Sequence, residues 1–325
     1  MQAFHLAQPT ALLDALVVAN ASDTKFIAGG TDLMQLLKEN VETPTQLVDL
    51  ERVGLSKIGA DAGGLRIEAM ARMSDVAAHP DVRAHWPVIA QALEASASPQ
   101  VRNMGTIGGN LLQRTRCGYF RDTGFNCNKR EPGSGCPAIA GENRMLAILG
   151  GSDHCIATHA SDLAVALTAL DAMLELRRAG GAQREVPITE FYRLPADTPH
   201  IETVLQAGEL ITAVIVPASA AARNSHYLKL RDRASFEFAL VSAAVALETA
   251  SGAVRDIRVA AGGVGTRPWR LPEVEAALRG KQLNDDALRE ASSRAGEGAR
   301  PATQNGFKQV LLRRAVLRAL QTASA

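Results

Sequence analysis

Apolar and polar positions along the first half of the chain predict a series of short helices and strands. Residues 10–20 have apolar positions at helical spacing, and residues 25–28 (KFIA) are typical of a short strand. After a glycine turn, the apolar residues of Leu33–Leu37 predict a helix, and residues 46–50 (QLVDL) predict a second strand. A strand–helix–strand unit of this length favours parallel pairing of its two strands.

The pattern continues into a mixed α+β arrangement. Residues 55–70 predict a β-hairpin around Gly63 and Gly64, whereas residues 98–157 are rich in glycine and are expected to be mostly loop. The apolar run Ala239–Leu247 fits a helix as well as a buried strand. Pro217 and the Ala/Ser run after it are typical of a linker. Further helices are expected at 81–96, 161–173, 270–279, 284–296 and 304–322, and further strands at 172–177, 184–188, 209–216, 226–231 and 254–263.

Composition narrows the class of protein. The hydrophobic share of 46% and charged share of 21% are those of a folded chain, and 325 residues suggest about two or three domains. The 35 basic and 34 acidic residues give a net charge of +1, so electrostatics gives no reason to expect nucleic acid or an anionic membrane as partner. An aromatic share of 4% argues against a stacking platform for single-stranded nucleic acid.

Neither a membrane span nor a signal peptide is expected. The apolar run that begins at Phe238 stops at Glu248, well short of the ~20 residues that a spanning helix needs. The first basic residue is Lys25, so no charged region precedes an apolar stretch near the N-terminus. If the protein leaves the cytoplasm, we expect a partner to carry it.

Four cysteines form the clearest candidate for a metal site. Cys117, Cys127, Cys136 and Cys155 are the only cysteines, with 9, 8 and 18 residues between neighbours. Two disulfides, a zinc site and an iron–sulfur cluster are the competing interpretations. The absence of a signal peptide argues against disulfides, and the absence of close C-x2–4-C pairs argues against structural zinc.

Two glycine turns are candidates for binding phosphate. Gly29-Gly30-Thr31-Asp32 lies between a strand and a helix that Thr31 or Asp32 can cap, and Gly105-Thr106-Ile107-Gly108-Gly109-Asn110 is the second turn. Free N–H groups and a helix N-terminus attract anions, and glycine lets a phosphate approach the backbone. Each turn alone is equally compatible with an ordinary tight turn. Neither has a dinucleotide-fold or P-loop fingerprint, and no G-x-S-x-G or H-E-x-x-H motif is present.

At these turns the chain resembles the flavoprotein (medium) subunit of molybdenum hydroxylases, the xanthine dehydrogenase and carbon monoxide dehydrogenase family. Residues 25–33 (KFIAGGTDL) and 106–110 (TIGGN) look like its two FAD loops, and residues 158–163, 209–211 and Lys229 match three further FAD segments in the same order. The resemblance implies that pyrophosphate lies at the glycine turns, that Asp162 bonds sugar or ribityl hydroxyls, and that Lys229 lies beside the flavin ring. The FAD-binding residues that it implies are Phe26, Ile27, Ala28, Gly29, Gly30, Thr31, Asp32, Leu33, Thr106, Gly109, Asn110, Asp162, Leu210, Ile211 and Lys229.

The same resemblance implies a fold and a division into domains. A vanillyl-alcohol-oxidase (PCMH)-type FAD domain of two α/β subdomains is expected at residues 1–217, with its subdomains at about 1–54 and 55–217. A C-terminal α+β domain with a small antiparallel sheet is expected at residues 223–325.

Residues 114–156 are similar to an insertion found in a subgroup of aldehyde oxidoreductases whose flavin subunit holds an extra 4Fe–4S cluster. This similarity implies that the four cysteines each ligate one iron. It further implies an electron-transfer subunit that receives electrons from 2Fe–2S centres of a small partner and passes them to an external acceptor. The substrate, an aldehyde, would be oxidised at the molybdenum cofactor of a large partner.

Several alternatives stay open at this point. The chain could serve a molybdenum hydroxylase for xanthine, an aromatic N-heterocycle or CO, or be a stand-alone flavin oxidase or a zinc-stabilised binding module. Non-covalent FAD and an acceptor other than NAD are expected, since neither glycine loop contains His and no second nucleotide motif is visible. The resemblance implies a periplasmic location through a partner's export signal, with the cytoplasm as the alternative.

Overall fold

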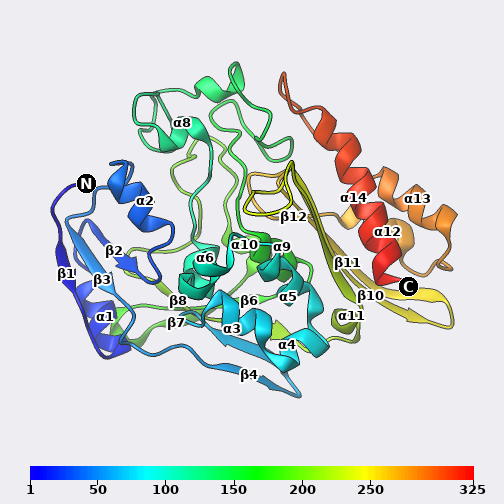
Figure 1. Cartoon of the computed structure of the whole chain (residues 1–325), viewed down its shortest axis with the longest axis horizontal. Coiled ribbons are helices and arrows are strands. Elements are labelled where there is room, and N and C mark those ends of the chain that lie inside the picture. Colours follow the sequence, from blue (N-terminus) through cyan, green and yellow to red (C-terminus); the bar gives the residue numbers. More distant parts are fainter.

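The N-terminal strands form a parallel sheet in the computed structural model, which describes residues 1–325 (Figure 1). Strands β2 (Thr24–Ile27) and β3 (Gln46–Asp49) pair in parallel around helix α2 (Leu33–Lys38), as the sequence predicts. Strand β1 (His5–Ala7) adds to the other edge of β3, and α1 (Leu12–Val18) connects it to β2. The pattern did not predict β1, because its three residues are largely exposed and have no clear alternation.

The second sheet has five antiparallel strands in the order β4–β5–β8–β6–β7. Its first two strands are the predicted hairpin, and the others lie close to their predicted positions. The bounds are β4 (Ile58–Asp61), β5 (Gly64–Glu68), β6 (Met173–Arg177), β7 (Gln183–Pro187) and β8 (Leu210–Pro217).

Short helices pack on this sheet to form the largest hydrophobic core. The single helix expected at 81–96 is wrong: prolines begin two shorter helices there, α4 (Pro80–His85) and α5 (Pro87–Glu94). Residues expected as a linker after Pro217 contain α11 (Ala220–Arg223), whose Ala221 and Ala222 are buried in the core. The remaining helices around this sheet are α3 (Met73–Ala78), α6 (Pro99–Met104), α7 (Ile107–Leu111), α9 (Asp162–Thr168) and α10 (Ile188–Phe191).

The third sheet resolves the ambiguous Ala-rich run, which is a strand. Strand β10 (Val241–Ala250) is central in the antiparallel order β12–β11–β10–β9. Its Ala244 and Ala246 face the large core, whereas Val241, Val245 and their alternate neighbours face the C-terminal core. Both faces are therefore buried, which removes the polar alternation that normally identifies a strand.

Helices near the C-terminus cover the outer face of the third sheet. They lie close to their predicted positions, and the last and longest is α14 (Phe307–Ala323). The other elements of this region are β9 (Ser225–Leu230), β11 (Ala253–Gly262), β12 (Trp269–Arg270), α12 (Pro272–Leu278) and α13 (Asp285–Ser293).

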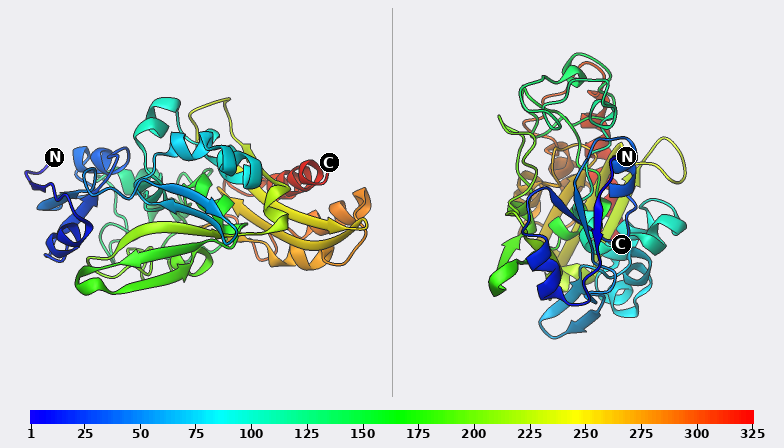
Figure 2. Two further views of the ribbon diagram at one scale, coloured as in Figure 1. Left: turned by 90° about the horizontal axis from the view of Figure 1, so that it is seen from below. Right: turned by 90° about the vertical axis from the view of Figure 1, so that its left-hand side faces the viewer.

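The three sheets follow one another along the long axis, with the two termini at opposite ends (Figure 2). The cysteine-containing segment 112–160 lies at one edge, between α2 and α14 (Figure 1). It is mostly loop, as predicted, with the short α8 (Gly118–Arg121) and the 3-10 turn η1 (Pro137–Ile139). It packs with Leu36 of α2 and Val41 into a small hydrophobic core. None of the helices is long and apolar enough to cross a membrane.

Candidate functional site: a cleft between two glycine turns

The first glycine turn presents a row of free backbone donors. None of the N–H groups of residues 28–33 donates a hydrogen bond within the protein. The backbone takes this course because Gly30 has a φ of +68°, a conformation that side chains disfavour. Asp32 occupies the N-cap position of α2, but its side chain makes no capping bond. A row of unpaired N–H groups before a helix is a suitable environment for an anion.

The two glycine turns lie against each other. A Cβ on Gly29 would stand 1.8 Å from the carbonyl oxygen of Met104 and 3.2 Å from the Cα of Gly105. Only glycine allows the turn between β2 and α2 to approach the end of α6 so closely. The packing therefore fixes the first turn relative to the second.

The second glycine turn has few donors to spare. The hydroxyl of Thr106 caps α7 by accepting from the N–H of Gly109 at 3.2 Å. The N–H groups of Ile107 and Gly108 donate to the carbonyls of Ala71 and Ala69 at 3.0 and 2.8 Å. This turn therefore supplies close backbone approach and shape rather than a second row of free donors.

A cleft of about 510 Å³ separates the N-terminal sheet from the five-stranded sheet and is lined by both turns. A volume in this range suits a cofactor-sized ligand. Twelve of the predicted FAD residues line it: Phe26, Ile27, Ala28, Gly29, Gly30, Thr31, Asp32, Leu33, Thr106, Gly109, Leu210 and Ile211.

The other three predicted FAD residues do not line the cleft. The Lys229 ammonium bonds Asp162 Oδ2 at 2.8 Å and the carbonyl of Ala95 at 3.1 Å. The Tyr227 hydroxyl donates to the other oxygen of Asp162 at 2.5 Å. The Asn110 side chain accepts from Ser161 at 2.6 Å. The contacts of Asp162, Lys229 and Asn110 to FAD stay predictions, since their polar atoms are engaged within the protein.

His159 stands where the cleft meets a second cavity of about 220 Å³, and it lines both. Its ring packs edge-on against Tyr192 at 4.4 Å, and its Nδ1 accepts from the N–H of Ser161 at 3.3 Å. Burial lowers the pKa of His159 to about 4, so the imidazole is neutral at pH 7. Asp162 lines the second cavity, not the main cleft.

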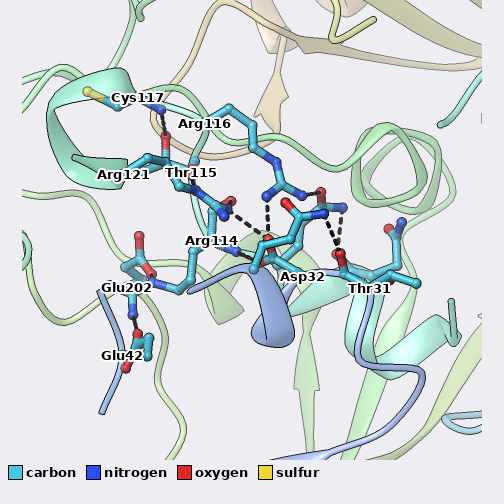
Figure 3. A network of polar contacts seen from close by, with 12 residues as sticks. Thr31, Asp32, Glu42, Arg114, Thr115, Arg116, Cys117, Arg121 and Glu202 are labelled. Carbon is cyan, nitrogen blue, oxygen red and sulfur yellow. Dashed lines mark hydrogen bonds and ion pairs between the residues drawn. The ribbon is translucent and has the colours of Figure 1, made fainter. Parts of the chain in front are cut away.

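Charged side chains of the cysteine segment surround the acidic residues of the cleft wall. Arg116 and Arg121 both pair with Asp32, and Arg114 pairs with Glu42 (Figure 3). Burial alone would raise the pKa of Asp32, but the adjacent guanidiniums outweigh it and lower the pKa. The sequence gives no local signal for these pairs, because their members are 72 to 89 residues apart along the chain.

The four cysteines converge on one small cavity beside the cleft. Cys117, Cys127 and Cys155 are buried, Cys136 is half-buried, and none forms a disulfide. Burial raises the pKa of the Cys117 thiol to about 11. No group of three or more His, Cys, Asp or Glu side chains is close enough together to hold a single metal ion. Cys155 also lines the main cleft, so the two cavities share a wall.

Comparison with known proteins decides the family. Residues 2–219 match the family described as the FAD-binding domain in molybdopterin dehydrogenase, and residues 225–323 match the CO dehydrogenase flavoprotein C-terminal domain. The chain belongs to this family of FAD-binding molybdopterin dehydrogenase proteins. It is therefore the FAD-binding component of an oxidoreductase, and the expected α+β fold class is confirmed.

Individual relatives agree with this assignment. The chain is 47% identical, over 96% of its length and 95% of the relative's, to the aldehyde oxidoreductase FAD-binding subunit PaoB of Escherichia coli. It is 29% identical to the glyceraldehyde dehydrogenase medium chain of Sulfolobus acidocaldarius, over 93% of this chain and 90% of that one. A carbon monoxide dehydrogenase structure from Hydrogenophaga pseudoflava superimposes with a TM-score of 0.76 at 27% identity, covering 99% and 97% of the two chains.

The residues of the cleft fit the FAD of this family. The row of N–H groups at residues 28–33 and the hydroxyl of Thr31, which makes no hydrogen bond in the protein, can bind an anionic diphosphate. Buried Leu210 and Ile211 supply an apolar wall. Glu209, the first residue of the same matched segment, holds Arg184 at 2.7 and 2.8 Å.

The sequence analysis missed most of the other polar residues that line the cleft. Arg114, Tyr192, Arg193, Glu202 and Thr266 all line the cleft, and Tyr192 additionally bonds the carbonyl of Leu111 at 2.9 Å. Glu202 comes from a loop with no periodicity and no motif. No signal in the sequence could have indicated it.

Proposed function

We propose that this chain is the FAD-carrying electron-transfer subunit of a heteromeric, molybdenum-dependent aldehyde oxidoreductase. The observation that carries the proposal is the cleft with its row of free N–H groups, in a chain 47% identical to an aldehyde oxidoreductase subunit. Relatives with other substrates, such as the carbon monoxide dehydrogenase medium chain of Hydrogenophaga pseudoflava, are only 26% identical. This difference favours an aldehyde over CO or an N-heterocycle.

In this proposal the protein binds and orients a cofactor that supplies the redox chemistry. When bound, FAD would supply the capacity to accept and give up electrons. The residues 28–33 bind the diphosphate, and Leu210 and Ile211 exclude water from one side of the cleft. His159 stays neutral and fixed by its bond to the N–H of Ser161, so it adds no charge to the site.

The partners in the proposal are a large subunit with the molybdenum cofactor and a small subunit with 2Fe–2S centres. Electrons would reach this chain from the small subunit and leave to an external acceptor other than NAD. The acceptor and the periplasmic location stay predictions.

We propose further that Cys117, Cys127, Cys136 and Cys155 hold a 4Fe–4S cluster. Their convergence on one buried cavity supports this, because four thiolates are the usual ligands of such a cluster. A single zinc ion needs all four sulfurs about 2.3 Å from one point. A 4Fe–4S cluster would bind each sulfur through a different iron, so its ligands stand further apart than those of a single ion.

Lys129 is the basic residue best placed to offset the cluster's negative charge. It lines both the cysteine cavity and the cleft, and its side chain is 9% exposed. Its ammonium is shared with Glu202 at 2.7 Å, so it also ties the cysteine segment to the cleft wall.

The function is tested on the purified complex and on the isolated chain. The complex should reduce its flavin when an aldehyde is added, and the isolated chain should not, because the chemistry at the substrate is on the large subunit. Xanthine, an N-heterocycle and CO serve as comparison substrates. Faster flavin reduction by one of these, or turnover by the isolated chain, would overturn the aldehyde proposal.

The cluster is tested separately by metal analysis. The isolated chain should contain about four irons per protomer, and Cys127→Ser should lose them. FAD content is measured in parallel, and an unchanged FAD content would show that the cleft of Cys127→Ser is intact. Ser152→Ala, a change in the same segment outside the cysteine set, is the control. Stoichiometric zinc, or unchanged iron in Cys127→Ser, would refute the cluster without affecting the flavin assignment.

A further inference from the structure

The carboxylate of Asp32, in the first glycine turn, is bound entirely by residues of the cysteine segment. Asp32 Oδ2 accepts from the backbone N–H of Arg114 at 2.8 Å. Asp32 Oδ1 pairs with the Arg121 guanidinium at 2.8 Å and also with Arg116. Figure 3 shows the side chains of Arg116 and Arg121, on either side of Cys117 in the sequence, reaching Asp32. We refer to Asp32 with Arg116 and Arg121 as the arginine clamp.

Arg121 is the central member of the clamp. It is the last residue of α8, the short helix that begins directly after Cys117. Its Nε donates to the carbonyl of Thr115 at 2.9 Å. Its Nη2 additionally reaches the carbonyl of Arg114 at 3.2 Å. A planar guanidinium with several fixed donors can hold a carboxylate and two carbonyls in one geometry, which lysine cannot reproduce.

The clamp acts on the turn that binds the diphosphate. Asp32 contributes one of the free N–H groups of residues 28–33, so the position of its side chain constrains the backbone of the row. The N–H groups of the row donate no hydrogen bonds, although the carbonyls of Gly30 and Asp32 accept from N–H groups of α2. Two further contacts fix the turn from outside the helix: Gly29 packs against Met104, and the clamp holds the Asp32 side chain.

Electrostatics also require the clamp. An unpaired carboxylate next to the free donors would repel an anionic diphosphate. The network contains five basic residues, Lys25, Arg114, Arg116, Arg121 and Lys129, against three acidic residues, Asp32, Glu42 and Glu202, a net charge of +2. The glycine turns themselves contain no Lys or Arg, and four of the five basic residues of the network, all except Lys25, come from the cysteine segment.

We propose that Arg121 and Arg116 are positioning residues for the FAD diphosphate, acting through Asp32, and that FAD binding and the order of segment 114–121 are thermodynamically coupled. This inference rests on FAD binding, which the family of the chain supports. It does not depend on whether the substrate is an aldehyde or on whether the cysteines hold a cluster. Because coupling is reciprocal, FAD should order the segment to the extent that the segment tightens FAD binding.

The test compares variants of the full chain, stripped of flavin and titrated with FAD. Arg121→Gln should weaken FAD binding about tenfold, within the usual range for coupled sites, and Arg121→Lys should recover only part of the loss. The control is Arg144→Gln, which removes another arginine–carboxylate pair of the cysteine segment, with Asp232, away from the cleft. It should leave FAD affinity within twofold of wild type.

Asp32→Asn separates positioning from simple charge. Removing an anion beside a diphosphate should tighten binding if only charge matters, whereas loss of the clamp should weaken it. Weaker binding supports the proposal, and unchanged or tighter binding overturns it. Because Asp32 lies outside the cysteine segment, this variant still tests the positioning role of the clamp if Arg121→Gln does not fold.

Amide hydrogen exchange measures the reciprocal effect. FAD should slow exchange at residues 114–121 in wild type, and Arg121→Gln should lose this slowing while FAD still protects residues 106–111. Equal protection of 114–121 in wild type and Arg121→Gln would overturn the coupling. Failure of the wild-type chain to bind FAD would instead refute the flavin assignment itself.

Discussion

Gly29→Ala should weaken FAD binding by about a hundredfold, because it separates the two glycine turns. The added Cβ would lie 1.8 Å from the carbonyl oxygen of Met104, where ordinary contact begins at 3.4 Å. The obstacle is backbone, so it cannot rotate away, and the turn must move by about 1.5 Å if it alone yields. A misplacement near 1 Å in a binding site can reduce function about 10²-fold, equivalent to about 2.7 kcal/mol.

The measurement is a titration of the flavin-free chain with FAD, followed by flavin fluorescence. The same overlap should lower the free energy of unfolding by about 1–3 kcal/mol, so urea unfolding is measured in parallel. Gly59→Ala is the matched control, since a Cβ on Gly59 in β4 meets nothing within 4 Å. If Gly29→Ala stays folded and binds FAD within twofold of wild type, the contact between the turns does not position the diphosphate site.

Three further predictions concern buried ionisable groups. Burial holds the folded pKa of His159 near 4, against 6.5 unfolded, so the unfolded state gains its proton first as pH falls. The free energy of unfolding should therefore drop by about 1–3 kcal/mol between pH 6.5 and 4, and His159→Gln should flatten that slope in urea titrations. Lys229→Met should lower the free energy of unfolding by about 3–5 kcal/mol, because it leaves the Asp162 carboxylate buried without its cation. Adding Asp162→Asn should restore part of this lost stability. Lys308→Met should lower the free energy of unfolding by about 2–4 kcal/mol, since the carbonyls of Met145, Leu146 and Gly263 would lose the ammonium that donates to them. The exposed Lys281→Met should change thermal stability little, and an equal loss there would contradict the argument for Lys308.

Local patterns were sufficient for most of the secondary structure. The parallel β2–α2–β3 unit and the β4–β5 hairpin follow from periodicity and glycine turns, which act over a few residues. The pattern failed where burial was unusual: β10 is apolar on both faces because Ala244 contacts one core and Val245 the other. It also failed at Pro87, where one apolar stretch contains two helices.

The same division applies to the candidate site. The sequence by itself determined the two glycine turns and the four clustered cysteines, because both depend on short-range chain geometry and on residue chemistry. Only the tertiary structure decided that Asp32 is held by Arg114, Arg116 and Arg121, which are 82 to 89 residues away along the chain. It likewise placed Lys229 in a buried pair with Asp162 rather than in the main cleft. Such pairings depend on how distant segments pack, and the spacing of residues along the chain does not encode that packing locally.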